Sequence, residues 1–491
     1  MLQRHATHPL TLLACALAGG ALGLFSPFLS TPAAVIGRLF VNLLEMAALP
    51  LLVVAIAFGL RNLLGLPHRG RRVLMALGAA LLMLWLCGLA GAFGGQAAGL
   101  GRNLSDADQL QLGQLIQREG GAAEQTAVPL YDDTADRAAA QPPAGAVGHG
   151  LIPDNAYAAF VRGRLPAVLL CALIFGLAFA SLERPASRAF AQQLEAVYRA
   201  LEVLIRRTNL LLPLLAFGMA AHLAAQTEAR TLVLLAGLLG TLLLASLLLA
   251  GLALLAICQQ GRCSPLAALS ALKGPLLITL VSPSPVSAIP ATIEALSSRL
   301  GFSRGVAELL VPTGAVFLRA GAALHVALIG VFVAQLYGRE IGLTDALWLG
   351  SLAALAALTV IDAGVWGGLS AAGALLVWLQ LPPEAVLPVL LLVDRLCEGP
   401  RNLTSLLCVG ALTALVSGGL PSERRSDADG APAPPWYVTL TRPVLASALA
   451  CVVVAGTLTT LVGVGIGLRQ AQATETLPTA ASTASSRVAR P

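Results

Sequence analysis

Long uncharged runs of apolar residues recur along the chain, and most of them have the length of a membrane-spanning helix. A helix needs about 20 apolar residues to cross the hydrocarbon layer of a bilayer. One span over about 38–62 has charged residues near its ends, Arg38 and Arg61, and is interrupted between them only by Glu45. The uninterrupted runs are at 9–29, 73–100, 165–182, 208–227, 231–257, 320–338, 403–420 and 443–468. This pattern predicts a polytopic helical membrane protein, because a transmembrane barrel would show alternating segments of about 10 residues.

The stretch 264–420 is divided differently from the rest of the chain. Prolines and glycines break it into short apolar pieces, such as 346–361 and 363–383. In transporters, interrupted hydrophobic segments line the substrate cavity, because backbone that is released from helical hydrogen bonding is tolerated there. The functional site is therefore expected in this stretch.

The composition agrees with a membrane protein and excludes several other classes. Of the 491 residues, 57% are hydrophobic and only 11% are charged, whereas a soluble domain carries roughly 25% charged residues. A cytosolic enzyme, a disordered protein and a nucleic-acid-binding module are therefore excluded. The eight cysteines lie in or beside apolar runs and form no CxxC pair, so neither a disulfide framework nor a zinc site is predicted.

Charges in the loops predict the orientation of the chain. The loop 61–72 contains four arginines and no acidic residue, which places it and the N-terminus in the cytoplasm. The acid-rich stretch 101–162 is expected outside, and the arginine-bearing segments 183–207 and 421–442 inside. The first apolar run, behind Arg4, also has the form of a signal peptide, but the spans that follow at once favour a retained helix. We expect an integral protein of a bacterial inner membrane.

Three charged residues share one face of the helix predicted within 384–418. Asp394, Glu398 and Arg401 are spaced i, i+4 and i+7, which places them on one helical stripe. Charges at membrane depth are expensive and usually functional. Arg401 offers a planar fork for a carboxylate, and Glu398 can accept a hydrogen bond from an ammonium group; the alternative is a structural ion-pair ladder. The glycine and proline between Glu398 and Arg401 are expected to disturb the helix.

Arg319 is a further charged group deep in an apolar segment. It does not deprotonate and cannot easily reach the membrane surface, so it needs a buried acidic partner or a water-filled cavity. His325 lies six residues further on and on a different helical face. A lone histidine is usually a satisfied polar residue, and the alternative is a proton relay. Glu45 and Asp362 are weaker candidates of the same kind.

Enzyme signatures are absent from the sequence. It contains no HExxH, no GxSxG with plausible partners, no Walker-type loop and no GxGxxG. The serines of the segment SPSPVSAIP are not accompanied by a base. No catalytic residue, metal site, cofactor or nucleic-acid partner is therefore predicted.

Five segments, in order along the chain, resemble segments of the dicarboxylate/amino acid:cation symporter family, which has the glutamate-transporter fold. LFVNLLEMAALPLLVVAIAFGL at 39–60 is similar to its second helix, and residues 151–182 are similar to the segment that leads into its fourth. SPSPVSAIPATIEALSSRLGFSRGVAELLVPTGAVF at 282–317 resembles its serine-rich first hairpin and seventh helix. IDAGVWGGLSAAGALL at 361–376 resembles the tip of its second hairpin, and VDRLCEGPRNLTSL at 393–406 resembles its substrate-binding eighth helix.

The resemblance implies an all-α polytopic membrane protein with eight transmembrane helices, two re-entrant hairpins and inverted repeats, to which this chain adds one C-terminal transmembrane helix. It also implies a homotrimer in the lipid bilayer, in which a mobile part of each protomer carries a small anionic substrate by an elevator-type movement. The expected segments are 1–100 for helices one to three, 101–162 for an external polar loop, 163–262 for helices four to six, 263–420 for the transport core, 421–442 for a cytoplasmic linker, 443–468 for the extra helix and 469–491 for a disordered tail.

The resemblance further implies roles for individual residues. The position of Glu398 is commonly an aspartate that binds the amino group of the substrate. Arg401 matches the arginine that binds the side-chain carboxylate, and Asn402 also lines the site. The other residues expected to bind substrate are Ser284, Ser287, Gly364, Gly367, Asp394 and Ser405. Because Glu398 and Arg401 are both retained, an acidic amino acid is favoured over a plain dicarboxylate.

The departures from the family concern its sodium sites. The seventh helix of the family carries an asparagine-methionine-aspartate-glycine-threonine stretch that binds sodium, whereas residues 318–322 of this chain read Leu-Arg-Ala-Gly-Ala. The sodium-binding asparagine and aspartate of the eighth helix correspond to Ser405 and Val409. Sodium needs several oxygen ligands, so we expect these sites to be lost. Arg319 is hypothesised to replace the missing cation, paired with Glu398 or Asp394.

Three functions remain open from the sequence. The favoured one is a secondary transporter of acidic amino acids or C4 dicarboxylates, either independent of sodium or coupled to protons through Glu398, Asp394 or His325. The second is a divergent member that binds a ligand without translocating it and acts as a sensor or assembly partner. The third is an anion-conducting pore.

Overall fold

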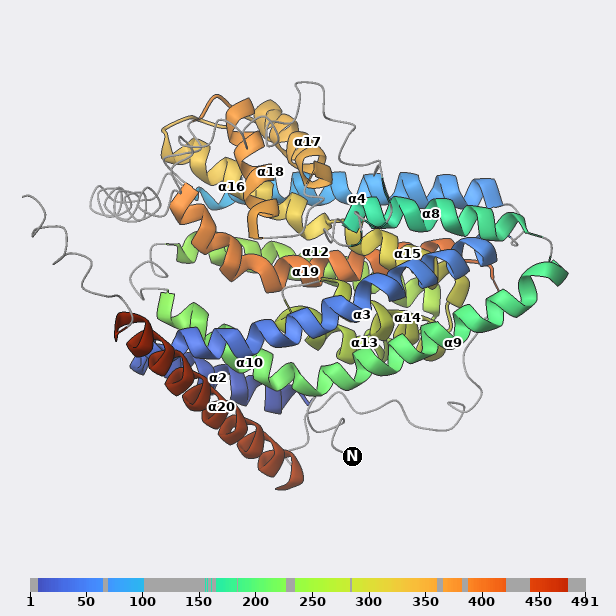
Figure 1. Cartoon of the computed structure of the whole chain (residues 1–491). Helices are drawn as coiled ribbons and strands as arrows, with labels where there is room; N and C mark the ends of the chain where they lie inside the picture. Colours follow the sequence, from blue (N-terminus) through green and yellow to red (C-terminus); the bar gives the residue numbers. More distant parts are fainter. Residues whose placement is uncertain are drawn as a thin grey trace, which may run out of the picture. The chain divides into compact units, whose positions relative to one another are not determined.

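The structure, a computed structural model, describes residues 8–64, 69–100, 155, 157, 160, 165–182, 184–226, 235–282, 285–359, 365–381, 387–420 and 442–475. Within these ranges all regular structure is helical, as the hydropathy pattern predicts (Figure 1). Most of the predicted external loop 101–162 and of the predicted linker 421–442 lies outside the described residues, as does the predicted tail from 476 onward. The first seven residues of that predicted tail, 469–475, belong instead to the last helix, Arg442–Glu475.

Several helices have the length and composition of membrane spans. The sufficiently long apolar stretches among the described residues are Gly70–Ala98, Phe190–Ala225, Ala236–Gly261, Arg304–Leu336 and Pro443–Gly463. Three of these stretches present leucines at the protein surface: Leu74, Leu247 and Leu461 are 71%, 69% and 71% exposed. Apolar side chains of this kind suit contact with lipid. The stretch Arg304–Leu336 is by contrast almost entirely buried within the protein. The other long apolar helices, with their exposed leucines, indicate that the chain is an integral membrane protein.

The chain divides into two compact units, and the first contains both ends of the described chain. It comprises residues 1–42, 209–228 and 439–491. Its helices are α2 (Pro9–Phe25), the start of α3 (Ser30–Leu64), α10 (Leu212–Gln226) and α20 (Arg442–Glu475). Helices α2 and α10 pack backbone to backbone, because a Cβ on Gly19 or Gly23 would overlap a carbonyl oxygen of α10. Helix α20 packs against both of them.

The second unit, residues 43–208 and 229–438, contains the rest of α3 and the remaining helices. Its centre is α16, which is buried from Ala320 to Gln335 and packs against α4, α12, α17, α18 and α19. Two helical hairpins belong to this unit, one formed by α13 and α14 and the other by α17 and α18. The helices are α4 (Arg69–Ala98), α8 (Leu165–Ser181), α9 (Arg184–Thr208), α12 (Ala236–Gly261), α13 (Pro265–Val281), α14 (Ile289–Glu294), α15 (Arg304–Phe317), α16 (Ala320–Leu336), α17 (Leu343–Thr359), α18 (Val365–Trp378) and α19 (Leu387–Ser417).

A row of small residues on α4 lets this helix approach α16 and α17 closely. We call Gly88, Gly91 and Gly95 the glycine seam. A Cβ on Gly88 would overlap the carbonyl oxygen of Gly350 in α17. One on Gly91 would overlap the carbonyl oxygen of Leu324 in α16. Helices in lipid associate largely through such close van der Waals packing, so the seam holds α4 against the centre of the unit.

Helix α9 was not predicted by the hydropathy pattern, which indicated only an arginine-bearing cytoplasmic segment at 183–207. Charged residues interrupt every apolar run in this part of the sequence, so no uncharged window reveals the helix. The structure shows that it is amphipathic: Tyr198 is 4% exposed, whereas the side chain of the adjacent Arg199 is 73% exposed. A periodicity of 3.6 residues, rather than mean hydropathy, is the signal of such a helix.

Candidate functional site

The buried apolar stretch 304–336 is interrupted in its middle, between α15 and α16. Leu318 and Arg319 join the two helices, and their ψ angles are 65° and 58°. With φ angles of −88° and −83°, both residues are close to the inverse γ-turn conformation rather than helical. The carbonyl oxygen of Arg319 accepts hydrogen bonds of 2.9 and 3.1 Å from two N–H groups in the first turn of α16. Arg319 therefore occupies the N-cap of a broken helix.

The first turn of α16 is tied directly to α19. The N–H of Gly321 donates to Ser405 Oγ over 3.0 Å, and this hydroxyl donates to the carbonyl oxygen of Arg401, also over 3.0 Å. A Cβ on Gly321 would overlap that same carbonyl oxygen. Glycine is thus required for the backbone of α16 to approach the backbone of Arg401 this closely.

The positions where the resemblance places sodium ligands are mostly apolar and buried. Leu318, Ala320, Ala322 and Val409 are at most 3% exposed. Val409 fills the space beside α15, because a Cβ on Gly314 would lie 2.7 Å from one of its methyl groups. The Ser405 hydroxyl already makes the two hydrogen bonds described above. The side chains of Leu318, Ala320, Ala322 and Val409 therefore supply hydrocarbon and no oxygen ligand.

Helix α19 carries the predicted charged stripe. It runs from Leu387 to Ser417 with Pro400 inside it, so the proline lies within the helix and does not end it. Pro400 lacks an N–H and therefore removes one helical hydrogen bond, the one to the carbonyl of Leu396. The turn beyond the proline is supported by Thr404 Oγ1, which donates to the Pro400 carbonyl oxygen over 3.0 Å.

Asp394, Arg401 and His325 form a buried group that we call the Asp394 cluster. Arg401 Nη1 donates to Asp394 Oδ1 within α19. His325 Nε2, on α16, lies 3.4 Å from the same oxygen atom. The side chains of Asp394, Arg401 and His325 are only 6%, 12% and 2% exposed. Within this cluster, the arginine expected to bind a substrate carboxylate is engaged by a carboxylate of the protein.

Arg319 and Glu398 are two further charged residues of this region. Arg319 interacts electrostatically with Glu398 and also with Asp394 and Arg401 of the Asp394 cluster. The two arginines and two carboxylates sum to zero net charge. The structure thus brings together, around the break in 304–336, the four charged residues that the sequence analysis selected.

The remaining predicted site residues are placed as follows. Ser287 is fully buried in the 3-10 turn between α13 and α14, and it takes part in a polar or electrostatic interaction there. Asn402 Nδ2 is buried and has no hydrogen-bond partner in the described part of the chain. Gly367 belongs to α18. Ser284 and Gly364 lie outside the described residues, as does Asp362, and the same holds for the side chain of Glu45.

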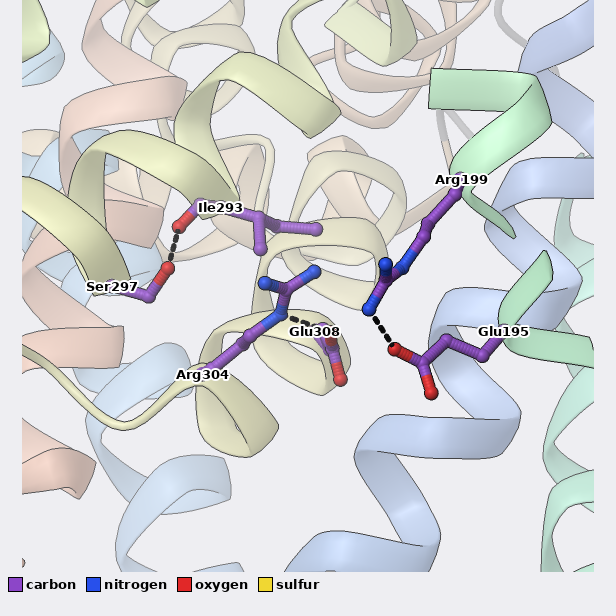
Figure 2. Close-up of polar contacts among 6 residues, drawn as sticks. All are labelled: Glu195, Arg199, Ile293, Ser297, Arg304 and Glu308. Atoms are coloured by element: carbon purple, nitrogen blue, oxygen red, sulfur yellow. Dashed lines mark hydrogen bonds and ion pairs between the residues drawn. The ribbon is translucent and has the colours of Figure 1, made fainter. Parts of the chain in front are cut away.

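A second group of charged residues, which the sequence analysis did not select, links α9 and α15. Arg304 Nε donates to Glu308 Oε1 over 2.8 Å, and Glu308 is buried (Figure 2). The Arg304 guanidinium carbon lies 6.0 Å from the centre of the Tyr198 ring of α9. On α9 itself, Arg199 and Glu195 form an exposed pair of 2.6 Å. The i, i+4 spacing of Arg304 and Glu308 was the available signal in the sequence.

Comparison with known proteins identifies sequence similarity over most of the chain. The sequence profile of the sodium:dicarboxylate symporter family matches residues 9–418. A C4-dicarboxylate transport protein of Stenotrophomonas maltophilia (strain R551-3) is 27% identical over 411 residues, which cover 81% of this chain and 85% of the relative. One from Paracoccus denitrificans is 27% identical over 84% of this chain and 87% of its own length. One from Cupriavidus necator is 32% identical over 54% of this chain and 61% of its own length.

Proposed function

Because the chain belongs to the sodium:dicarboxylate symporter family, we propose that it is a secondary transporter of C4 dicarboxylates or acidic amino acids. The family is one of transporters and not of enzymes. The relatives named for C4-dicarboxylate transport support a dicarboxylate substrate. The observation that carries the proposal is the Asp394 cluster, which places an arginine in a buried site beside a broken helix.

Arg401 is proposed to bind a substrate carboxylate. Its guanidinium can form two parallel hydrogen bonds with a carboxylate, which is a strong and directional arrangement. The buried amide of Asn402, on the next residue of α19, is a donor without a protein partner and suits an oxygen of the same substrate. Glu398 is the acceptor proposed for an amino group, which would extend the substrate range to acidic amino acids.

The site is proposed to work without the usual sodium ions. A hard monovalent cation needs several oxygen ligands, and the corresponding side chains here are hydrocarbon, with the one hydroxyl of Ser405 already engaged. Arg319 is proposed to supply a fixed positive charge in their place. Its interactions with Glu398 and Asp394 support this assignment. The driving ion would then be a proton, carried by Asp394, Glu398 or His325.

Movement is proposed to follow an elevator mechanism in a homotrimer of the bacterial inner membrane, with the N-terminus in the cytoplasm. The moving part would contain α4 and the helices from α12 to α19. The glycine seam and the contact between Gly321 and Arg401 support this grouping, because both join its helices through backbone. The re-entrant hairpins are proposed to be formed by α13 with α14 and by α17 with α18, and the contacts within each pair support this.

The test is uptake of radiolabelled succinate and L-aspartate into proteoliposomes. We expect uptake that a proton gradient stimulates and that removal of sodium leaves unchanged. Arg319→Met is expected to weaken uptake and substrate affinity, whereas Arg71→Met, which changes an exposed arginine of α4, serves as the matched control. Strong dependence of uptake on sodium, or unchanged uptake and substrate affinity in Arg319→Met, would contradict the sodium-free assignment.

A second candidate is a member that binds its ligand without moving it. Helix α20 favours this candidate, since it lies beyond the matched residues 9–418 and packs against α2 and α10. Thermal stabilisation by succinate without any uptake would select this function. Anion currents in the absence of substrate would select instead the third function, that of an anion-conducting pore.

A further inference from the structure

We propose that His325 binds a proton and then competes with Arg401 for one oxygen of Asp394, so that protonation makes Arg401 available to an anionic substrate. This inference rests on the proposed transport function and specifies how substrate binding is regulated at the same site. His325 is in this view a positioning residue, because it acts on the substrate through Asp394 and Arg401.

The geometry that carries the inference is the sharing of a single atom. Arg401 Nη1 and His325 Nε2 approach Asp394 Oδ1 from two different helices, α19 and α16. Arg401 makes a hydrogen bond with that oxygen. His325 Nε2 lies 3.4 Å away, is buried, and has no hydrogen-bond partner in the described part of the chain. The histidine is therefore held next to a carboxylate without being satisfied by it.

The surroundings of His325 leave few other groups that could respond to its charge. Asp394 and Arg401, both on α19, are the charged groups that act on it. The other helices against α16 are α4, α12, α17 and α18, and their described residues place no charged group on it. The Cys397 thiol, also on α19, faces Asp394 and Arg401. A charge gained by His325 is consequently felt at the Asp394–Arg401 pair.

Protonation changes the balance between the two partners of Asp394. A neutral imidazole gains little from a carboxylate at this distance, whereas an imidazolium forms a charge-assisted hydrogen bond that is roughly twice as strong as a neutral one. Two cations on one oxygen also repel each other, and this repulsion is strong where the surroundings are apolar. Arg401 is then the partner that leaves, because its longer and more flexible side chain can turn away from Asp394.

The released arginine and the added proton together favour an anion. Protonation adds one positive charge to a site whose charges otherwise cancel, and one substrate carboxylate restores neutrality at Arg401. Proton and anion therefore bind cooperatively, and by thermodynamic reciprocity each raises the affinity for the other. Such coupling needs no metal ion and would give the chain a proton-driven uptake cycle.

The experiment measures succinate affinity against pH on the purified full-length protein in detergent. His325→Gln keeps a side chain of similar size with a hydrogen-bond donor but cannot titrate. As the pH is lowered from about 8 to about 5, we expect wild-type affinity to rise by about tenfold more than that of His325→Gln. The comparison also subtracts the titration of succinate itself. His222→Gln, in α10 of the other unit, is the control expected to behave as wild type.

Proton uptake on succinate addition, followed with a pH-indicator dye, is the second readout. We expect it in wild type and not in His325→Gln. If His325→Gln does not fold, His325→Asn takes its place. Equal pH dependence and equal proton uptake in wild type and variant would overturn the inference.

The two proposals fail in distinguishable ways. If wild type binds neither succinate nor L-aspartate at any pH, the proposed function falls. The proton site is then tested by melting temperature against pH without substrate. We expect the plots of melting temperature against pH to differ in shape between wild type and His325→Gln, and to coincide when both proteins also carry Asp394→Asn. That result supports a proton shared between His325 and Asp394. If the plots of wild type and His325→Gln already coincide without Asp394→Asn, the inference is overturned.

Discussion

A single methyl group at Gly321 should disrupt the candidate site. In Gly321→Ala the new Cβ overlaps the carbonyl oxygen of Arg401, with the carbonyl carbon and Cα of that residue also closer than real contacts allow. The obstacle is backbone, so no side chain can rotate out of the way. Overpacking of this kind costs about 1–3 kcal/mol, and losing the hydrogen bond from Gly321 to Ser405 adds about 0.5–1.5 kcal/mol. Together these terms destabilise the contact between α16 and α19 by about 1.5–4.5 kcal/mol.

The measurement combines the melting temperature in detergent with succinate affinity. The strain is relieved only by moving Arg401 away from α16, and a displacement of about 1 Å at a binding group can lower activity by about 100-fold. Gly94→Ala is the matched control, since a Cβ on this glycine of α4 meets nothing within 4 Å. We expect the control to be neutral or slightly stabilising. Wild-type melting temperature and affinity in Gly321→Ala would refute the close approach of the two backbones.

Two further predictions concern other contacts of the second unit. Arg72 Nη1 donates to the carbonyl oxygen of Val416 over 2.5 Å, near the end of α19, so Arg72→Gln should destabilise the protein by about 1–3 kcal/mol, read as a lower melting temperature, while the exposed Arg71→Gln should not. Tyr198→Phe keeps the ring beneath Arg304 and should keep the cation–π contact of about 0.5–1 kcal/mol. Tyr198→Leu should lose that contact and increase hydrogen exchange in α9 and α15; equal exchange in the two variants would contradict this.

Mean hydropathy predicted most of the helices but neither the amphipathic α9 nor the break in the stretch 304–336. The residues at the break, Leu318 and Arg319, are neither glycine nor proline. Local helix propensity therefore gives no reason for a helix to end there. The interruption depends on tertiary contacts, above all on the close approach at Gly321. Pro400 illustrates the opposite case, since a strong local signal lies inside a helix that continues on either side of it and removes one hydrogen bond without ending the helix.

The sequence also identified the charged residues of the site, but not the contact between His325 and Asp394. Spacing along one helix was sufficient to place Asp394, Glu398 and Arg401 on the same stripe. It gave no means of placing His325 beside Asp394, because these residues are on different helices and the contact depends on how α16 packs against α19. The resemblance to a transporter family was confirmed by the match over residues 9–418, whereas the roles of individual residues stay predictions.

The glycine seam has a mechanical meaning for any change at His325. Where helices touch through backbone, no side chain can change rotamer to take up a small shift, so α4, α16 and α17 behave as one stiff body. A displacement of α16 is then expected to move α4 and α17 with it. The first turn of α16 is tied to α19 through Gly321, so the compliant point is the segment 337–342 at the other end of the helix, where Gly338 has a φ of 72°. Proton binding at His325 would thus be expressed as motion at that end of α16.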